Sequence, residues 1–243
     1  MESSERLDQR VDLDWRQVAR NVLRSRLLDE LEENELTPQG EVNYQFSAKG
    51  HELAQVLLAM HLNHDHDAAT VYYRSRPFML AAGLTLEEAL ASGLARTGGL
   101  TEGRDVGVMF ALPPRHGPTV LPASGDVGAQ YTPAAGWAQA VTYRASQLGE
   151  AEWQGAMAAA LGGDGSVAAN GFWAALNMVT TLRLPMLFFI EDNAYGLSVP
   201  AGRQYPGGNI VENLSAYGTL QLIQGSGTDP VQTSELIVEA VAH

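Results

Sequence analysis

The stretch AAALGGDGSVAANGFWAALNMVTTLRLPMLFFIEDN, residues 158–193, decides the fold. An apolar run covers 157–161, an amphipathic pattern covers 168–182 and a second apolar run covers 186–190. Short apolar runs on either side of a segment with helical spacing predict a strand, a helix and a second strand. Because such a crossover joins parallel strands, the stretch predicts an α/β fold with a mostly parallel sheet.

Asp164 and Asn193 each follow the end of a predicted strand. Ligands of open parallel sheets bind beyond the carboxyl ends of the strands, so two neighbouring strands would bring both side chains to one crevice. Gly163 and Gly165 let the backbone approach a ligand, and the amide groups that open the next helix favour an anion. Carboxylate and amide oxygens suit Mg²⁺, which also binds substrate phosphates. The pattern therefore predicts a site for a metal-bridged diphosphate.

These residues also carry a family resemblance. The triplet at 163–165, followed after 27 residues by Asn193, resembles the thiamine-diphosphate motif. The flanking segments are Asn177-Met178, Leu184-Pro185, Phe188-Phe189-Ile190 and Asn193-Ala194-Tyr195-Gly196. They resemble the alpha subunit, or the alpha half of a fused chain, of the decarboxylating component of 2-oxo-acid dehydrogenase complexes. The resemblance covers nearly the whole chain and implies a three-layer α/β/α fold that binds the diphosphate side of thiamine diphosphate.

The resemblance implies a set of ligands. Mg²⁺ would be held by Asp164, Asn193 and the backbone carbonyl of Tyr195. The diphosphate would be held by the guanidinium of Arg74 and the hydroxyl of Tyr73, which suit phosphate oxygens. The implied cofactor-binding residues are Tyr73, Arg74, Gly125, Val127, Gly163, Asp164, Gly165, Ser166, Asn193 and Tyr195. Two alternatives stay open: Val127 fits a core position equally well, and Arg74 and the nearby Arg76 could instead pair with surface acids.

The resemblance implies an activity as well. It is oxidative decarboxylation of a small 2-oxo acid on thiamine diphosphate, with acyl transfer to the lipoyl group of a partner acyltransferase. In the family, a beta subunit or fused beta half supplies the glutamate that activates the cofactor, and a later loop supplies a histidine. This chain has neither and stops short of a typical alpha subunit, so we expect catalysis only with a partner. The alternatives are another thiamine-diphosphate enzyme, transketolase-like or acetoin-cleaving, and a non-catalytic truncated chain that binds a partner.

Two histidines are weak catalytic candidates. His51 lies in a Gly50–Gln55 run, GHELAQ, that resembles the family's GHEAAQ segment, and either a pocket role or a local hydrogen bond would explain it. The family pattern GR-x-x-x-x-H expects a histidine after Gly103-Arg104, where this chain has DVGVMF at 105–110. That position is either vacant or filled by His116.

A second group of histidines invites a zinc interpretation. His61, His64 and His66 stand beside Asp65 and Asp67, and histidines at short spacing can converge on one ion. No second pair of ligands accompanies them, so a solvated loop is the favoured interpretation.

Composition narrows the class of protein. The net charge is −13 with only 15 basic residues, which disfavours a nucleic-acid or anionic-membrane partner. The absence of cysteine excludes disulfides, thiolate metal sites and a cysteine nucleophile. The first residues, MESSERLDQR, lack the apolar core of a signal peptide, and no stretch approaches a membrane span, so we expect a cytoplasmic protein.

Local signals place the remaining elements. Helical spacing predicts helices over 14–36, 50–62, 86–94 and 133–147. Thr85 and Glu88 form a capping-box pattern at the start of the third, and Asp229 before Pro230 predicts the start of a last helix. Residues 97–122, rich in glycine and proline, predict a long loop. We expect a flexible amino terminus over 1–12 and one α/β domain over 13–243, apparently truncated at its carboxyl end.

Overall fold

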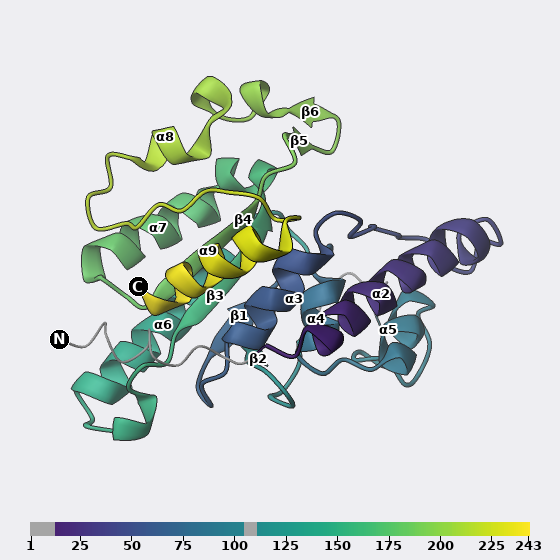
Figure 1. The fold of residues 1–243 in the computed structure, drawn as a ribbon, viewed down its shortest axis with the longest axis horizontal. Coiled ribbons are helices and arrows are strands. Elements are labelled where there is room, and N and C mark those ends of the chain that lie inside the picture. Colours follow the sequence, from purple (N-terminus) through teal and green to yellow (C-terminus); the bar gives the residue numbers. More distant parts are fainter. Residues whose placement is uncertain (1–12, 105–110) are drawn as a thin grey trace.

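A parallel sheet lies at the centre of the computed structural model, which describes residues 13–104 and 111–243 (Figure 1). Within these residues the sheet has the strand order β2-β1-β3-β4, and every neighbouring pair is parallel. The strands are β1 (Ala68–Thr70), β2 (Thr119–Val120), β3 (Ala158–Gly163) and β4 (Met186–Glu191). The prediction of an α/β fold with a parallel sheet is confirmed.

Helices connect and cover the strands. The α-helices are α2 (Trp15–Leu31), α3 (Glu52–His61), α4 (Arg76–Ala81), α5 (Leu86–Gly93), α6 (Tyr131–Ser146), α7 (Asn170–Leu182), α8 (Ile210–Leu214) and α9 (Pro230–Ala242). A π-helical turn, η1 (Glu32–Leu36), extends α2, and 3₁₀ turns are η2 (Ala151–Trp153), η3 (Asp164–Ala168), η4 (Ala201–Arg203) and η5 (Pro206–Gly208). A small antiparallel hairpin, β5 (Tyr195–Gly196) and β6 (Val199–Pro200), follows β4.

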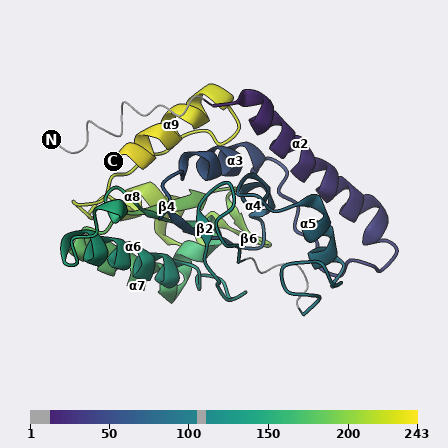
Figure 2. The same ribbon diagram turned by 90° about the horizontal axis from the view of Figure 1, so that it is seen from below.

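Alternate side chains of β3 enter two different apolar clusters. Ala159 and Leu161 pack with residues of α2, α3, α4 and α9, whereas Ala158 and Ala160 pack with residues of α6 and α7. This is the period of two expected of a strand that is covered on both faces. Figure 2 shows the two groups of helices on opposite sides of the sheet. The inner strands β1 and β3 are thus buried on both faces, whereas β4, at the end of the strand order, is half-buried over most of its length.

Most element boundaries follow the sequence patterns, with two differences. The helix expected over 168–182 begins at Asn170, because the 3₁₀ turn η3 comes first; the Ser166 hydroxyl closes that turn by donating to the Gly163 carbonyl at 2.6 Å. The expected loop over 97–122 contains the short strand β2, whose pairing partner β1 lies about fifty positions earlier. A strand this short carries too little local pattern to be recognised.

Several helix ends were predicted correctly. Thr85 and Glu88 form the expected capping box of α5, with bonds of 3.0 and 3.1 Å. Asp229 accepts a hydrogen bond from the backbone of Gln232 at the start of α9. The expected flexible terminus over 1–12 and the vacant histidine position within 105–110 lie outside the described residues. In the described part, none of the helices has both the length and the apolar composition needed to cross a bilayer.

The histidine-rich segment before β1 is a turn with Asn63 and Asp65 exposed, as a solvated loop predicts, but His64 and His66 are half-buried. The rings of His66 and Trp153 stack at 3.9 Å with an interplanar angle of 2°, and the indole of Trp137 donates to the His66 carbonyl. His61 lies buried in α3, where its Nδ1 bonds the Leu57 carbonyl. Across 13–104 and 111–243, no three histidine, aspartate or glutamate side chains converge on a metal position.

Candidate active site

Asp164 lies where β3 ends, beside the end of β4. Gly163 pairs with Glu191, so Asp164 and Asp192 leave the sheet on neighbouring strands. Asp164 is only 2% exposed, and its Oδ2 has no hydrogen-bond partner among the described residues. Burial, followed by the carboxylate of Asp192, raises the pKa of Asp164. A buried carboxylate oxygen without a partner is costly, which makes Asp164 the strongest candidate here for a ligand-binding group.

The segment after β4 folds back over the same corner. Asn193 is exposed, and its Oδ1 accepts the backbone N–H of Tyr195 at 3.0 Å, which leaves a second lone pair free. The backbones of Gly165 and Gly196 touch: a Cβ on Gly165 would lie 3.2 Å from the Gly196 Cα. Figure 1 shows the hairpin β5–β6 beyond the ends of β3 and β4. The turn after Asp164 therefore adjoins the segment that carries Asn193 and Tyr195.

Glu191, the last residue of β4, joins several elements beneath this corner. It is 7% exposed and accepts hydrogen bonds from Gln55 Nε2 at 3.0 Å and from the Tyr72 hydroxyl at 2.7 Å. The His51 Nδ1 lies 3.1 Å from its Oε1. Burial, and then the Glu191 carboxylate, raises the pKa of Tyr72 well above its usual range. Sequence reasoning missed Glu191; the only signal was an acid that closes the apolar run over 186–190.

His51 reaches the site from the start of α3. Its ring is half-buried and lies close enough to Asp164 to oppose the effect of burial on the pKa of that carboxyl group. The contact with Glu191 spans 140 positions, so it is not the local hydrogen bond that a first-turn histidine would make. A carboxylate acceptor favours the tautomer that carries the proton on Nδ1.

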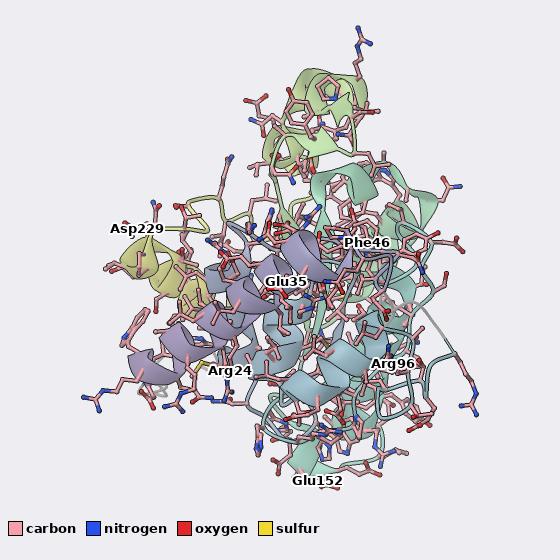
Figure 3. All side chains as sticks on the ribbon, turned by 90° about the vertical axis from the view of Figure 1, so that its right-hand side faces the viewer. Arg24, Glu35, Phe46, Arg96, Glu152 and Asp229 are labelled. Carbon is pink, nitrogen blue, oxygen red and sulfur yellow. The ribbon has the colours of Figure 1, made fainter. Side chains whose placement is uncertain are left out.

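Tyr73 and Arg74 follow β1 at the same edge of the sheet. The Tyr73 ring lies 4.4 Å from the ring of Phe46, and the Arg74 guanidinium lies 5.5 Å from the Tyr73 ring centre. Arg74 Nη1 donates to the Ser47 carbonyl, and Gln55 Nε2 donates to the Arg74 carbonyl at 3.2 Å. In Figure 3, Phe46 lies toward the end of the molecule that carries the hairpin. Glu152, which precedes β3, lies at the opposite end of the molecule.

Comparison with known proteins is decisive at this point. The sequence model of the family described as "Dehydrogenase E1 component" matches residues 19–243. The chain belongs to the dehydrogenase E1 component family.

Relatives agree with this assignment. The E1-component chain is 28% identical over 206 residues to the 2-oxoisovalerate dehydrogenase subunit alpha of Bacillus subtilis. The matched residues cover 84% of this chain and 59% of the relative. The chain is 29% identical over 174 residues to the pyruvate dehydrogenase E1 component subunit alpha of Zymomonas mobilis, covering 72% and 46%. The chain thus spans about half the length of the curated relatives it matches. The predicted resemblance to these alpha subunits is confirmed.

The turn before α6 of the E1-component chain packs on the start of α7. A side chain at Gly171 would collide with the Gly128 carbonyl, so this turn and that helix end are in direct contact. Gly125 and Val127 lie on the exposed side of the turn. Val127 is 62% exposed, so its alternative interpretation as a core residue was wrong, because the turn points its side chain outward.

Ser166 faces inward. Its hydroxyl donates to the Gly163 carbonyl and also bonds the buried Tyr131 hydroxyl. Both bonds use the side chain to hold the turn that carries Asp164. The cofactor contact of Ser166 stays a prediction, and its backbone is the part that these two bonds leave uncommitted.

His116 lies near the amino ends of the strands, whereas the site lies at their carboxyl ends. Ala68 pairs with Thr119, so residues before Thr119 lie at the amino ends of the parallel strands. The His116 ring lies instead beside Gly83, 3.3 Å from where a side chain on that glycine would begin. The suggestion that His116 replaces the family's loop histidine in this E1-component chain is therefore corrected.

Arg76 forms two ion pairs with buried acids. It donates to Asp29 at 3.0 Å and to Glu32 at 2.7 Å, and both carboxylates are buried. The alternative that Arg76 pairs with surface acids was wrong about the place, because Asp29 of α2 and Glu32 of η1 are both buried. Asp29 also accepts the backbone N–H of Ala48 at 2.7 Å. The E1-component chain thus uses Arg76 to hold its leading helix.

Proposed function

We propose that this chain is the alpha-type portion of a 2-oxo-acid dehydrogenase and binds thiamine diphosphate through Mg²⁺. Membership in the dehydrogenase E1 component family supports the reaction class, and relatives named for 2-oxoisovalerate and pyruvate indicate the substrate class, a small 2-oxo acid. In this proposal the sheet and its helices form the three-layer thiamine-diphosphate-binding fold.

The observation that carries the proposal is the free Oδ2 of the buried Asp164. A carboxylate oxygen, the amide oxygen of Asn193 and the backbone carbonyl of Tyr195 are the hard oxygen ligands that Mg²⁺ prefers. A bound cation would also remove the energetic cost of an ionised, desolvated carboxyl group. The residues present therefore fit the ion.

In this proposal the residues after the neighbouring strand β1 bind the diphosphate. Arg74 and Tyr73 follow β1, which pairs directly with β3, and the Ser47 carbonyl and the Phe46 ring hold them. A guanidinium and a phenol hydroxyl are suited to phosphate oxygens. The turn with Gly125 and Val127 would contact the cofactor through its backbone, as would Gly163, Gly165 and Ser166.

Thiamine diphosphate, when bound, supplies the carbanion chemistry of the decarboxylation. The chain's own residues hold and orient it. Glu191 fixes the turn that carries Asn193, and through Gln55 it also fixes the backbone at Arg74. His51 is the one histidine of this network, and we assign it to the substrate side of the site, where it can hold a proton near Asp164.

A second subunit is part of the proposal. Exposed apolar side chains surround the site, namely Val127, Tyr195, Leu197 and Val199. Apolar side chains gathered at the rim of a binding site are typical of a surface that a partner covers. We assign this rim to a beta subunit or fused beta half, which would complete the catalytic groups before acyl transfer to a lipoyl acyltransferase.

Calorimetric titration tests the proposal. Thiamine diphosphate is titrated with and without Mg²⁺ into the chain, alone and assembled with a beta-type partner. We expect metal-dependent binding, and Asp164→Asn should weaken it by more than the roughly 10- to 100-fold that loss of a supporting group costs. The ligand-free variant should melt at the same or a higher temperature, because it no longer contains a buried, unpaired charge.

Asp192→Asn is the matched control. It makes the same chemical change at the neighbouring strand end, but Asp192 is exposed and its retained Oδ1 can still accept the Ala194 N–H. We expect this variant to bind within a few-fold of the wild type. A correctly folded, assembled wild type that binds no cofactor would overturn the enzymatic proposal and favour a non-catalytic, partner-binding chain.

A further inference from the structure

Tyr205 is a buried tyrosine whose hydroxyl is not used by the protein. It lies between η4 and η5 and is 7% exposed, with its ring in the apolar cluster of α6 and α7. Its hydroxyl has no hydrogen-bond partner among the described residues. Buried tyrosine hydroxyls normally find a partner, so this one calls for an explanation.

The carboxylates of Asp164 and Asp192 act on the Tyr205 hydroxyl electrostatically. Burial, and next the carboxylates of Asp192 and Asp164, raises the pKa of Tyr205 to about 12. A tyrosine hydroxyl that keeps its proton can donate one hydrogen bond. The acceptor Asp164 Oδ2 is likewise without a partner, and the two groups do not bond each other. A third group that offers oxygen to the hydroxyl and positive charge to the carboxylate would satisfy both.

The position of Tyr205 is built into the fold. The adjacent Gln204 donates from Nε2 to the Val199 carbonyl at 2.9 Å. Its Oε1 fills the space beside Gly165, 2.7 Å from where a side chain on that glycine would begin. The backbone N–H of Ala201 donates to the Ala194 carbonyl at 2.9 Å. The segment over 201–205 is therefore fastened both to the turn after Asp164 and to the hairpin after Asn193.

We propose that Tyr205 is a further ligand-binding residue of this site, whose hydroxyl donates a hydrogen bond to an oxygen carried by the cation at Asp164. That oxygen belongs either to a water on the metal or to the diphosphate, which share the same acceptor chemistry. The inference rests on the proposed function, since it requires a metal at Asp164. It adds a binding group from the segment after the hairpin, outside the motif that spans 163–193.

Tyr205→Phe in the assembled alpha–beta protein is the test, because it deletes only the hydroxyl. Two titrations are compared with the wild type: Mn²⁺ alone, and thiamine diphosphate with Mg²⁺. We expect binding weakened about 10- to 100-fold, the effect of losing a hydrogen bond to a charged group. A loss already seen with Mn²⁺ alone identifies the acceptor as a metal-bound water, and a loss seen only with the cofactor identifies a diphosphate oxygen.

The melting temperature of the ligand-free protein separates binding from structure. Removing an unpaired, buried hydroxyl should leave it unchanged or raise it, whereas a merely structural hydroxyl would lower it. Tyr143→Phe, the same deletion at an exposed tyrosine of α6, is the control and should change neither quantity.

The outcomes distinguish the two proposals. If the wild type binds metal and cofactor and Tyr205→Phe binds them equally well, Tyr205 has no binding role, while the proposed function stands. A lower melting temperature with unchanged affinity has the same meaning. If the assembled wild type binds neither Mn²⁺ nor the cofactor, both proposals fail.

Discussion

The two glycines that flank Asp164 have different physical reasons to be glycine. Sequence reasoning assigned both to the close approach of a ligand. A side chain on Gly163 would meet nothing nearer than the Glu191 carbonyl at 4.0 Å. A side chain on Gly165 would lie 2.7 Å from Gln204 Oε1 and 3.2 Å from the Gly196 Cα. The protein's own hairpin, independent of any ligand, therefore requires Gly165.

This difference predicts unequal costs for two alanine substitutions. Gly163→Ala should change the free energy of unfolding by no more than about 0.5 kcal/mol, as an uncrowded substitution does. Gly165→Ala should lower it by about 1–3 kcal/mol, because the hairpin and Gln204 must shift to make room. Urea denaturation of the ligand-free protein measures both. Equal costs at the two positions would contradict the described packing of the hairpin.

At the scale of elements, a buried charge cluster fastens the leading helix. Arg76 of α4 bonds Asp29 of α2 and Glu32 of η1, and Asp29 also holds the loop at Ala48. Burial is the largest influence on both acids and raises the pKa of each. The neighbouring Ser47 carbonyl accepts the Arg74 guanidinium, so this cluster also supports the proposed diphosphate-binding arginine.

Arg76→Met should lower the free energy of unfolding by about 3–5 kcal/mol at pH 8, because it leaves two buried carboxylates unpaired. The deficit should shrink as the pH falls towards 5. Arg76 lowers the pKa of both acids in the wild type, so its loss raises these pKa values further above 3.8 and 4.5. The folded variant therefore takes up protons at a higher pH and gains more stability on acidification than the wild type does. Urea denaturation at both pH values measures this.

The matched control is Arg96→Met, which breaks the exposed pair with Glu41. It should change the free energy of unfolding by no more than about 1 kcal/mol at either pH, as exposed ion pairs do. A deficit in Arg76→Met that stayed constant or grew on acidification would show that its two acids are not the source of the loss.

At the scale of the whole molecule, the hairpin at the rim of the site carries an unusually exposed apolar side chain. Leu197, at the turn of the hairpin, is 90% exposed and has a φ of 55°. An exposed, branched apolar residue in the left-handed region is uncommon and costs the free chain energy. A partner that receives this side chain would explain both its exposure and its conformation.

Leu197→Asp should weaken association with a beta-type partner at least about tenfold, because a charge would enter an apolar contact. The chain's own stability should stay within about 0.5 kcal/mol of the wild type, since the side chain is exposed. Sedimentation of mixtures at graded concentrations measures the association. Leu148→Asp, at an exposed leucine that follows α6 near the opposite edge of the sheet, is the control and should associate normally.

The sequence by itself determined the strand–helix–strand unit, the helix caps and the location of Asp164 and Asn193 at the carboxyl edge of the sheet. These features depend on neighbours within a few positions: the alternation of a strand, the spacing of a helix, or a side chain such as Asp229 that bonds the backbone three residues on. Such signals survive in the sequence because they require no knowledge of the rest of the fold.

Only the tertiary structure decided which polar groups the protein satisfies internally and which it leaves without a partner among the described residues. Glu191 and Gln55 meet across 136 positions, Arg76 bonds two buried acids, and the Ser166 hydroxyl bonds inside the fold. Asp164 and Tyr205, in contrast, keep polar atoms without a partner among the described residues. The physical reason is that a polar group becomes buried only when distant elements pack together. An unpaired group therefore becomes costly, and meets a distant partner, only once the chain is folded.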